Sequence, residues 1–145
     1  MNRLTETLAN LKQQNKKALV AYLVAGDPDI ETTIDLMHLF VEAGVDAIEI
    51  GVPFTDPIAE GPVIQRAHDR ALKNNISLKD IYSMVEIFRN KDSSTPLILM
   101  GYLNTFMFHK KIIEENKNSA IDSILVVDIP GELNLNDYGI KSSSI

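Results

Sequence analysis

The chain contains no cysteine among its 145 residues. This absence excludes disulfide bonds, thiolate nucleophiles and zinc sites built on cysteine, and it is compatible with a reducing cytoplasm. Long apolar runs are also lacking, because no stretch approaches the roughly 20 residues that a membrane-spanning helix needs. Residues 1–6 include an early acidic residue, Glu6, and no apolar segment. We therefore expect no signal peptide.

Positive charge is scarce, with 14 lysines and arginines against 20 aspartates and glutamates and a net charge of -6. A broad nucleic-acid surface or a face for anionic membranes is therefore not expected. An acidic surface is still compatible with one local anion site, and so with a phosphate-bearing substrate. The three histidines show no metal-ligand spacing, and we predict no metal site. His38 and His68 are expected at helix surfaces.

Apolar segments of strand length alternate with amphipathic stretches. Strands are predicted at residues 18–24, 47–50, 96–100 and 123–128. The first is a continuous apolar run, which is typical of a strand buried on both faces. Apolar residues at helical spacing predict helices near residues 4–11, 30–41, 62–73, 77–88 and 109–117.

Several helix boundaries have recognisable signals. Asp27 is predicted to cap the second helix, with Pro28 at its first position, and Gly44 to close it. Ser77 and Asp80 have the spacing of a capping box.

This order of elements predicts right-handed crossovers and a parallel sheet. Residues 45–53 weakly repeat as 121–130, which indicates a barrel, although any two buried strands that end in a turn would look similar. A complete (β/α)8 barrel takes roughly 250 residues. We therefore expect α/β architecture: one domain over residues 1–145, with the first four βα units of a TIM barrel. Residues 131–145 show no helical stripe and form a tail whose structure the sequence does not indicate.

Glu49 is the most informative single residue, because it interrupts an apolar strand near its C-terminal end. Burial disfavours an ionised carboxylate unless something compensates. At the C-terminal mouth of a parallel barrel, such a group is a candidate general acid and base. The alternative is a glutamate that reaches solvent or pairs with a lysine or arginine.

The long loop after this strand, residues 51–61, contains two prolines and brings Asp56 and Glu60 to the same mouth. Loops at this face build active sites in barrel enzymes. The alternative is a solvated acidic loop.

Residues 49–65 read Glu-Ile-Gly-Val-Pro-Phe-Thr-Asp-Pro-Ile-Ala-Glu-Gly-Pro-Val-Ile-Gln. This long segment is very similar to the signature of tryptophan synthase alpha subunits. Residues 24–28, 100–104 and 125–130 resemble the family as well, so the resemblance covers about residues 1–130. It implies a lyase of tryptophan biosynthesis that splits indole-3-glycerol phosphate into indole and glyceraldehyde 3-phosphate by a retro-aldol reaction.

The resemblance assigns the proton transfers to Glu49. Glu60 matches a position where the family carries an aspartate that hydrogen-bonds the indole N–H. One added methylene moves the carboxylate by about 1 Å, and misplacement of that order can cost ~100-fold in rate, so reduced turnover is expected. Tyr22 matches a phenylalanine of the family, and its hydroxyl therefore needs a partner.

By the same resemblance, the substrate pocket is lined by Tyr22, Met100, Leu125 and Val127, with Tyr102 beside them. Taken singly, Leu125 and Val127 are more simply explained as barrel core. The surface toward the beta subunit is implied at Pro53, Asp56, Pro57 and Asn104.

The resemblance also implies the partners and the location. The reaction needs no cofactor, and pyridoxal phosphate belongs to the partner beta subunit of a cytoplasmic α2β2 heterotetramer. The family holds the substrate phosphate in loops after later strands, so we expect a chain of four units to be weakly active or inactive alone. Its open sheet edges are expected to favour dimerisation, aggregation or partial disorder. The alternatives are a non-catalytic remnant that binds or regulates the beta subunit, and another phosphate-sugar barrel enzyme such as an isomerase.

Overall fold

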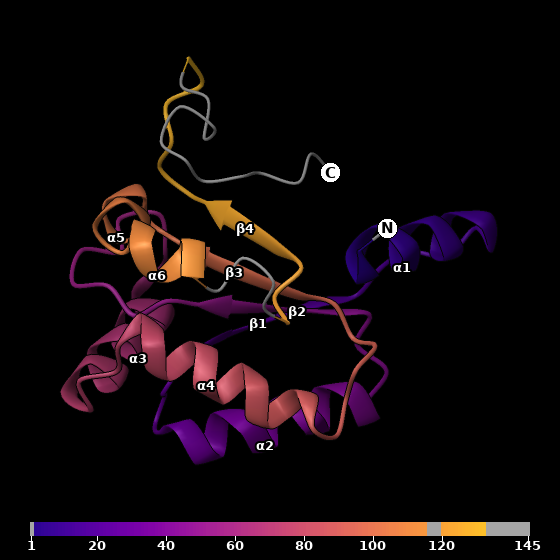
Figure 1. The fold of residues 1–145 in the computed structure, drawn as a ribbon, viewed down its shortest axis with the longest axis horizontal. Helices are drawn as coiled ribbons and strands as arrows, with labels where there is room; N and C mark the ends of the chain where they lie inside the picture. The colour runs from indigo at the N-terminus through magenta and orange to yellow at the C-terminus, as the bar shows by residue number, and fades with distance from the viewer. Residues whose placement is uncertain (1, 116–119, 133–145) are drawn as a thin grey trace.

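The computed structural model describes residues 2–115 and 120–132, and it shows a parallel sheet with helices packed against it (Figure 1). The elements in chain order are α1 (Arg3–Gln13), β1 (Val20–Val24), α2 (Ile30–Glu42), β2 (Ala47–Gly51), α3 (Pro62–Lys73), α4 (Leu78–Arg89), β3 (Leu97–Gly101), α5 (Leu103–Phe108), α6 (Lys110–Glu115) and β4 (Ser123–Val126). The predicted strands and their parallel order, β1-β2-β3-β4, are confirmed. Among the described residues, no helix is long and apolar enough to cross a membrane.

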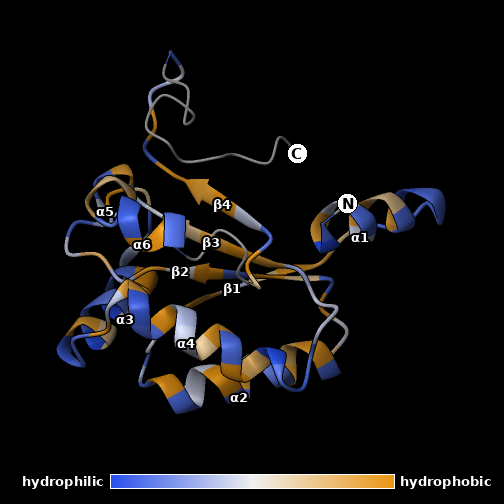
Figure 2. Ribbon diagram, in the orientation of Figure 1, coloured by the Kyte–Doolittle hydropathy of each residue, from blue (hydrophilic) through white to orange (hydrophobic). Residues whose placement is uncertain are grey.

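Alternate residues of the strands divide the sheet into two faces. One face, with Ile48, Ile50, Leu97 and Leu99, packs against α2 and α4 to form the main hydrophobic core. Figure 1 shows α2 and α4 together under this face, and Figure 2 shows the strongly hydrophobic strands above them. The opposite face carries the alternate residues of the same strands and is named here the inner face.

The inner face is more accessible to solvent than the core face. Its central row pairs Tyr22 with Glu49 and Glu49 with Ile98 in register, and all three are half-buried. Val20 on β1 is 44% exposed and Leu125 on β4 is 41% exposed. Leu125 is therefore not a core residue in this chain.

The start of α2 differs from the sequence prediction. Asp29, not Asp27, caps α2 by accepting a hydrogen bond from the Thr32 N–H at 2.7 Å. Asp27 instead accepts two hydrogen bonds of 2.7 Å from Arg70, a partner 43 residues away that local spacing does not reveal. The capping box of Ser77 and Asp80 is confirmed, and Gly44 follows α2 with a positive φ of 88°.

The helix predicted near residues 109–117 is confirmed as α6, and its last predicted residues, 116 and 117, lie outside the described part of the chain. The short helix α5, just before α6, was not predicted. The Asp128 side chain accepts a hydrogen bond of 2.7 Å from the Leu103 N–H at the start of α5. This contact satisfies a donor that a helix start leaves open. Most of the predicted tail, residues 133–145, also lies outside the described residues.

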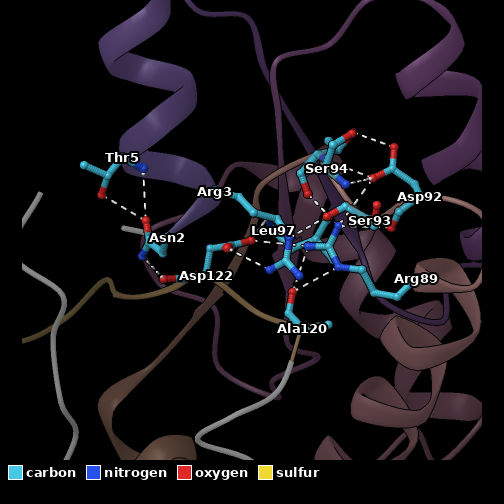
Figure 3. A network of polar contacts seen from close by, with 11 residues as sticks. Asn2, Arg3, Thr5, Arg89, Asp92, Ser93, Ser94, Leu97, Ala120 and Asp122 are labelled. Carbon is cyan, nitrogen blue, oxygen red and sulfur yellow. Dashed lines mark hydrogen bonds and ion pairs between the residues drawn. The ribbon is translucent and has the colours of Figure 1, made fainter.

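A buried ionic cluster joins the N-terminal segment to the sheet (Figure 3). Asp122, just before β4, accepts hydrogen bonds from Arg3 at 3.0 Å, from Arg89 at 3.2 Å and from the Leu97 N–H at 2.9 Å. Arg89 also donates to the carbonyl groups of Thr95 and Ala120. These contacts lie at the N-terminal ends of the strands, the side of a βα barrel at which conserved residues serve stability.

Candidate active site

The candidate site lies on the inner face and at the C-terminal ends of β1, β2 and β3. Glu49 occupies the centre of β2, as predicted. Burial, and then the negative charge of Glu60, raise the pKa of the Glu49 carboxyl above its ordinary value of 4.5. A raised pKa favours the protonated form, which is the form that a general acid needs.

Glu60 lies at the end of the loop after β2, and its side chain is only 7% exposed. Its Oε1 accepts a hydrogen bond from the Tyr22 hydroxyl at 3.1 Å. Its Oε2 accepts one from the Tyr102 hydroxyl at 3.1 Å and lies 3.0 Å from His68 Nε2. These four residues are named here the Glu60 cluster. Both tyrosine hydroxyls donate to this carboxyl group, and His68 Nε2 donates to it when that nitrogen carries a proton.

The prediction that His68 lies at a helix surface is wrong, because its side chain is 1% exposed. Residues 64, 67, 68 and 71 follow helical spacing, and Ala67 and Ala71 of this stripe pack on Val24 of β1. The sequence therefore held a signal for this site residue: the apolar stripe of α3 includes the histidine. His68 Nδ1 accepts a hydrogen bond from the Phe54 N–H at 3.0 Å.

Tyr102 follows β3 and is fully buried. Its ring stacks on Phe54 with the centroids 4.9 Å apart, and its hydroxyl accepts a hydrogen bond from the Ala59 N–H at 3.2 Å. Both contacts attach the loop after β2 to the end of β3. The loop that carries Glu60 is therefore held in place by α3 and by β3.

The partner that Tyr22 was expected to need is Glu60. Burial, and then the charge of Glu60, raise the pKa of the Tyr22 hydroxyl above its ordinary range. The hydroxyl consequently stays protonated and donates. Gly51 gives it space, because a Cβ at this residue would lie 2.2 Å from the hydroxyl oxygen.

The other predicted pocket and interface residues are less closely grouped. Met100 lies in β3 in register with Leu125 and is buried, and Val127 follows β4 and is half-buried. Asp56 and Asn104 are exposed at the same end of the sheet, Pro57 is half-buried and Pro53 is buried. The His, Asp and Glu side chains of residues 2–115 and 120–132 form no group of three able to hold a metal ion.

The pKa of Glu49 gives a prediction for stability against pH. Because its pKa is raised on folding, the folded chain binds this proton more tightly than the unfolded chain. The resulting stabilisation is fully present below the ordinary pKa of 4.5 and is lost as pH rises through the raised pKa. Glu49→Gln, which cannot ionise, should therefore gain stability relative to the wild type as pH rises from the ordinary pKa of 4.5 through the raised pKa. Urea unfolding at several pH values measures this difference, and a difference that stays constant with pH would contradict the assignment.

The four-stranded parallel sheet, with helices between its strands and carboxyl groups near their C-terminal ends, defines the chain as an α/β protein. Comparison with known proteins gives the family. The profile of the family described as "Tryptophan synthase alpha chain" matches residues 8–138. This chain belongs to the tryptophan synthase alpha chain family.

Individual relatives agree with this assignment. The tryptophan synthase alpha chain of Nitrosomonas europaea is 51% identical over 134 residues, which are 91% of this chain and 49% of the relative. The crystal structure of the alpha subunit from Legionella pneumophila is 46% identical and superimposes with a TM-score of 0.85, covering 90% of this chain and 50% of that one. The alpha chain within the α2β2 complex of Pyrococcus furiosus is 43% identical with a TM-score of 0.70, covering 78% of this chain and 46% of that one. The chain thus spans about half the length of its relatives, and its four βα units align with half of their TIM barrels.

Proposed function

We propose that this chain carries the proton-transfer site of the alpha reaction of tryptophan synthase. In that reaction, indole-3-glycerol phosphate is cleaved to indole and glyceraldehyde 3-phosphate. Carbon C3 of the indole ring must gain a proton while the side-chain hydroxyl loses one. The observation that carries the proposal is the pair of carboxyl groups in different environments, with Glu49 raised in pKa by burial and Glu60 surrounded by donors.

The two carboxyl groups take different roles in the proposed mechanism. Glu49 takes the proton of the hydroxyl and supplies one to C3, which needs a group with a pKa near neutral. Glu60 accepts a hydrogen bond from the indole N–H and stabilises the positive charge that develops on the ring. Tyr22 and Met100 offer the flat, largely apolar contacts that an indole ring needs. None of these steps requires a cofactor.

A chimera tests the proposal, because the chain spans only half of its relatives. Residues 1–130 of this chain are joined to the remaining half of the Nitrosomonas europaea alpha chain. Incubated with indole-3-glycerol phosphate, the chimera should release indole, measured colorimetrically. The chain alone should release little or none, because remote binding of the phosphate supports the reacting centre. A folded chimera that forms no indole, beside an active parent relative, would refute the proposal.

A second candidate function is binding to a tryptophan synthase beta subunit in the cytoplasm. The observation that favours it is the apolar surface exposed at the C-terminal end of the sheet, near Asp56 and Asn104. Phe108 on α5 is 86% exposed, and Ile58 in the loop after β2 is 72% exposed. Adding the chain to a beta subunit, and measuring tryptophan formation from indole and serine, distinguishes the two functions. Stimulation by a chain or chimera that forms no indole would favour a regulatory role.

A further inference from the structure

The Glu60 cluster joins four parts of the chain that are far apart in sequence. Tyr22 comes from β1, Glu60 from the loop after β2, His68 from α3 and Tyr102 from the residue after β3. We propose that Tyr22 and His68 are positioning residues for Glu60. Their hydrogen bonds fix the position of the Glu60 carboxylate and keep it available as a hydrogen-bond acceptor. The proposal rests on the role given above to Glu60.

The contacts of His68 make it a hydrogen-bond donor to Glu60. Its Nδ1 faces the Phe54 N–H at 3.0 Å and therefore carries no proton. In the neutral ring the proton must then lie on Nε2, which is 3.0 Å from Glu60 Oε2. Since the ring is buried in the stripe of α3, neither its orientation nor its tautomer is free to vary. The N–H of Phe54, in the loop after β2, thus fixes the His68 tautomer that donates to Glu60 at the end of the same loop.

Tyr22 donates a hydrogen bond to the other carboxylate oxygen of Glu60, Oε1. Its hydroxyl is 3.1 Å from Glu60 Oε1 and 3.5 Å from His68 Nε2. An ionised carboxylate offers about four acceptor positions. The described residues supply three donors, one to Oε1 and two to Oε2, which leaves Oε1 able to accept one further hydrogen bond. An indole N–H is a donor of the required kind.

Tyr22 and Glu60 contact each other directly through the tyrosine hydroxyl. A glutamate side chain has several rotatable bonds, so its carboxylate needs added constraints to have a defined position. The Tyr22 hydroxyl supplies one such constraint, and a phenylalanine at residue 22 would not.

Nuclear magnetic resonance of the chain itself, with isotope-labelled histidine and glutamate, tests the proposal without turnover. In the wild type, His68 should carry its proton on Nε2 and none on Nδ1, and this proton should exchange slowly with water. Glu60→Asp should speed the exchange roughly ten- to a hundredfold, because a hydrogen bond to a charged group is lost. A proton on Nδ1 of wild-type His68 would overturn the proposal, and this measurement needs no variant.

The carboxyl resonance of Glu60 gives the second measurement. The chemical shift of this resonance should change in Tyr22→Phe and in His68→Asn, because each substitution removes one hydrogen-bond donor to Glu60. His68→Gln should return it toward the wild-type position, since a glutamine amide reaches the place of Nε2 whereas an asparagine amide reaches only that of Nδ1. Tyr82→Phe, at a buried tyrosine of α4 outside the cluster, should leave it unchanged. A Glu60 resonance that moves in neither Tyr22→Phe nor His68→Asn would overturn the proposal, whereas a chimera without indole formation would refute only the proposed function.

Discussion

Glu49→Gln in the chimera is expected to lower the rate of indole formation by roughly 10²–10⁴-fold, which is the usual contribution of a general acid and base. Glutamine keeps the size of the side chain but can neither give nor take a proton at neutral pH. The loss should appear in kcat, with a much smaller change in KM, because the substrate still meets the same pocket. Steady-state kinetics with indole-3-glycerol phosphate measure both constants.

Glu86→Gln is the matched control for this prediction. Glu86 lies on the exposed side of α4, so the same chemical change there should leave the rate near that of the parent chimera. If Glu49→Gln kept the rate within about tenfold of the parent, the proton transfers would have to be assigned to another group.

Asp122→Ala should lower the free energy of unfolding of the chain by about 3 kcal/mol, near the lower end of the range for breaking a buried ion pair. The substitution removes one partner each of Arg3 and Arg89, and it leaves the buried Leu97 N–H without its acceptor. Arg89 keeps the Asp92 carboxylate at 3.4 Å and three carbonyl groups, those of Asp92, Thr95 and Ala120, which is why a larger loss is not expected. Urea denaturation with an unchanged m value measures the effect.

Asp35→Ala provides the comparison for the stability prediction, because Asp35 is exposed on α2. An exposed substitution of this kind should change stability by less than about 0.5 kcal/mol. Equal effects of the two variants would show that the ionic cluster before β4 contributes no more to the free energy of unfolding than one exposed charged residue does.

The strands and most helix ends were predictable because their signals are local. The run at residues 18–24, the proline at residue 62 and the pair of Ser77 and Asp80 each indicate an element within a few residues. Glu49 was also predictable as a site residue, since a carboxylate within an apolar strand is unusual. Each of these signals lies in residues that are close together in the sequence, so it can be recognised without the tertiary structure.

The polar contacts of the site were not predictable in the same way. Glu60 binds tyrosines that are 38 and 42 residues away, and no short-range pattern specifies such pairs. Asp27 was assigned to a helix cap because the sequence did not reveal Arg70 as its partner. His68 is an intermediate case: its place in the apolar stripe of α3 is a signal for burial, but the sequence prediction placed it at the helix surface.

The division of the sheet into two faces separates the residues that stabilise the fold from those that react. Ile48 and Ile50 hold α2 and α4, while Glu49 between them points to the opposite side of the same strand. Substitutions on one side therefore need not disturb the packing on the other. Such a sheet lets side chains on the inner face be exchanged, those of residues 22 and 60 among them, while the apolar layer beneath keeps the fold.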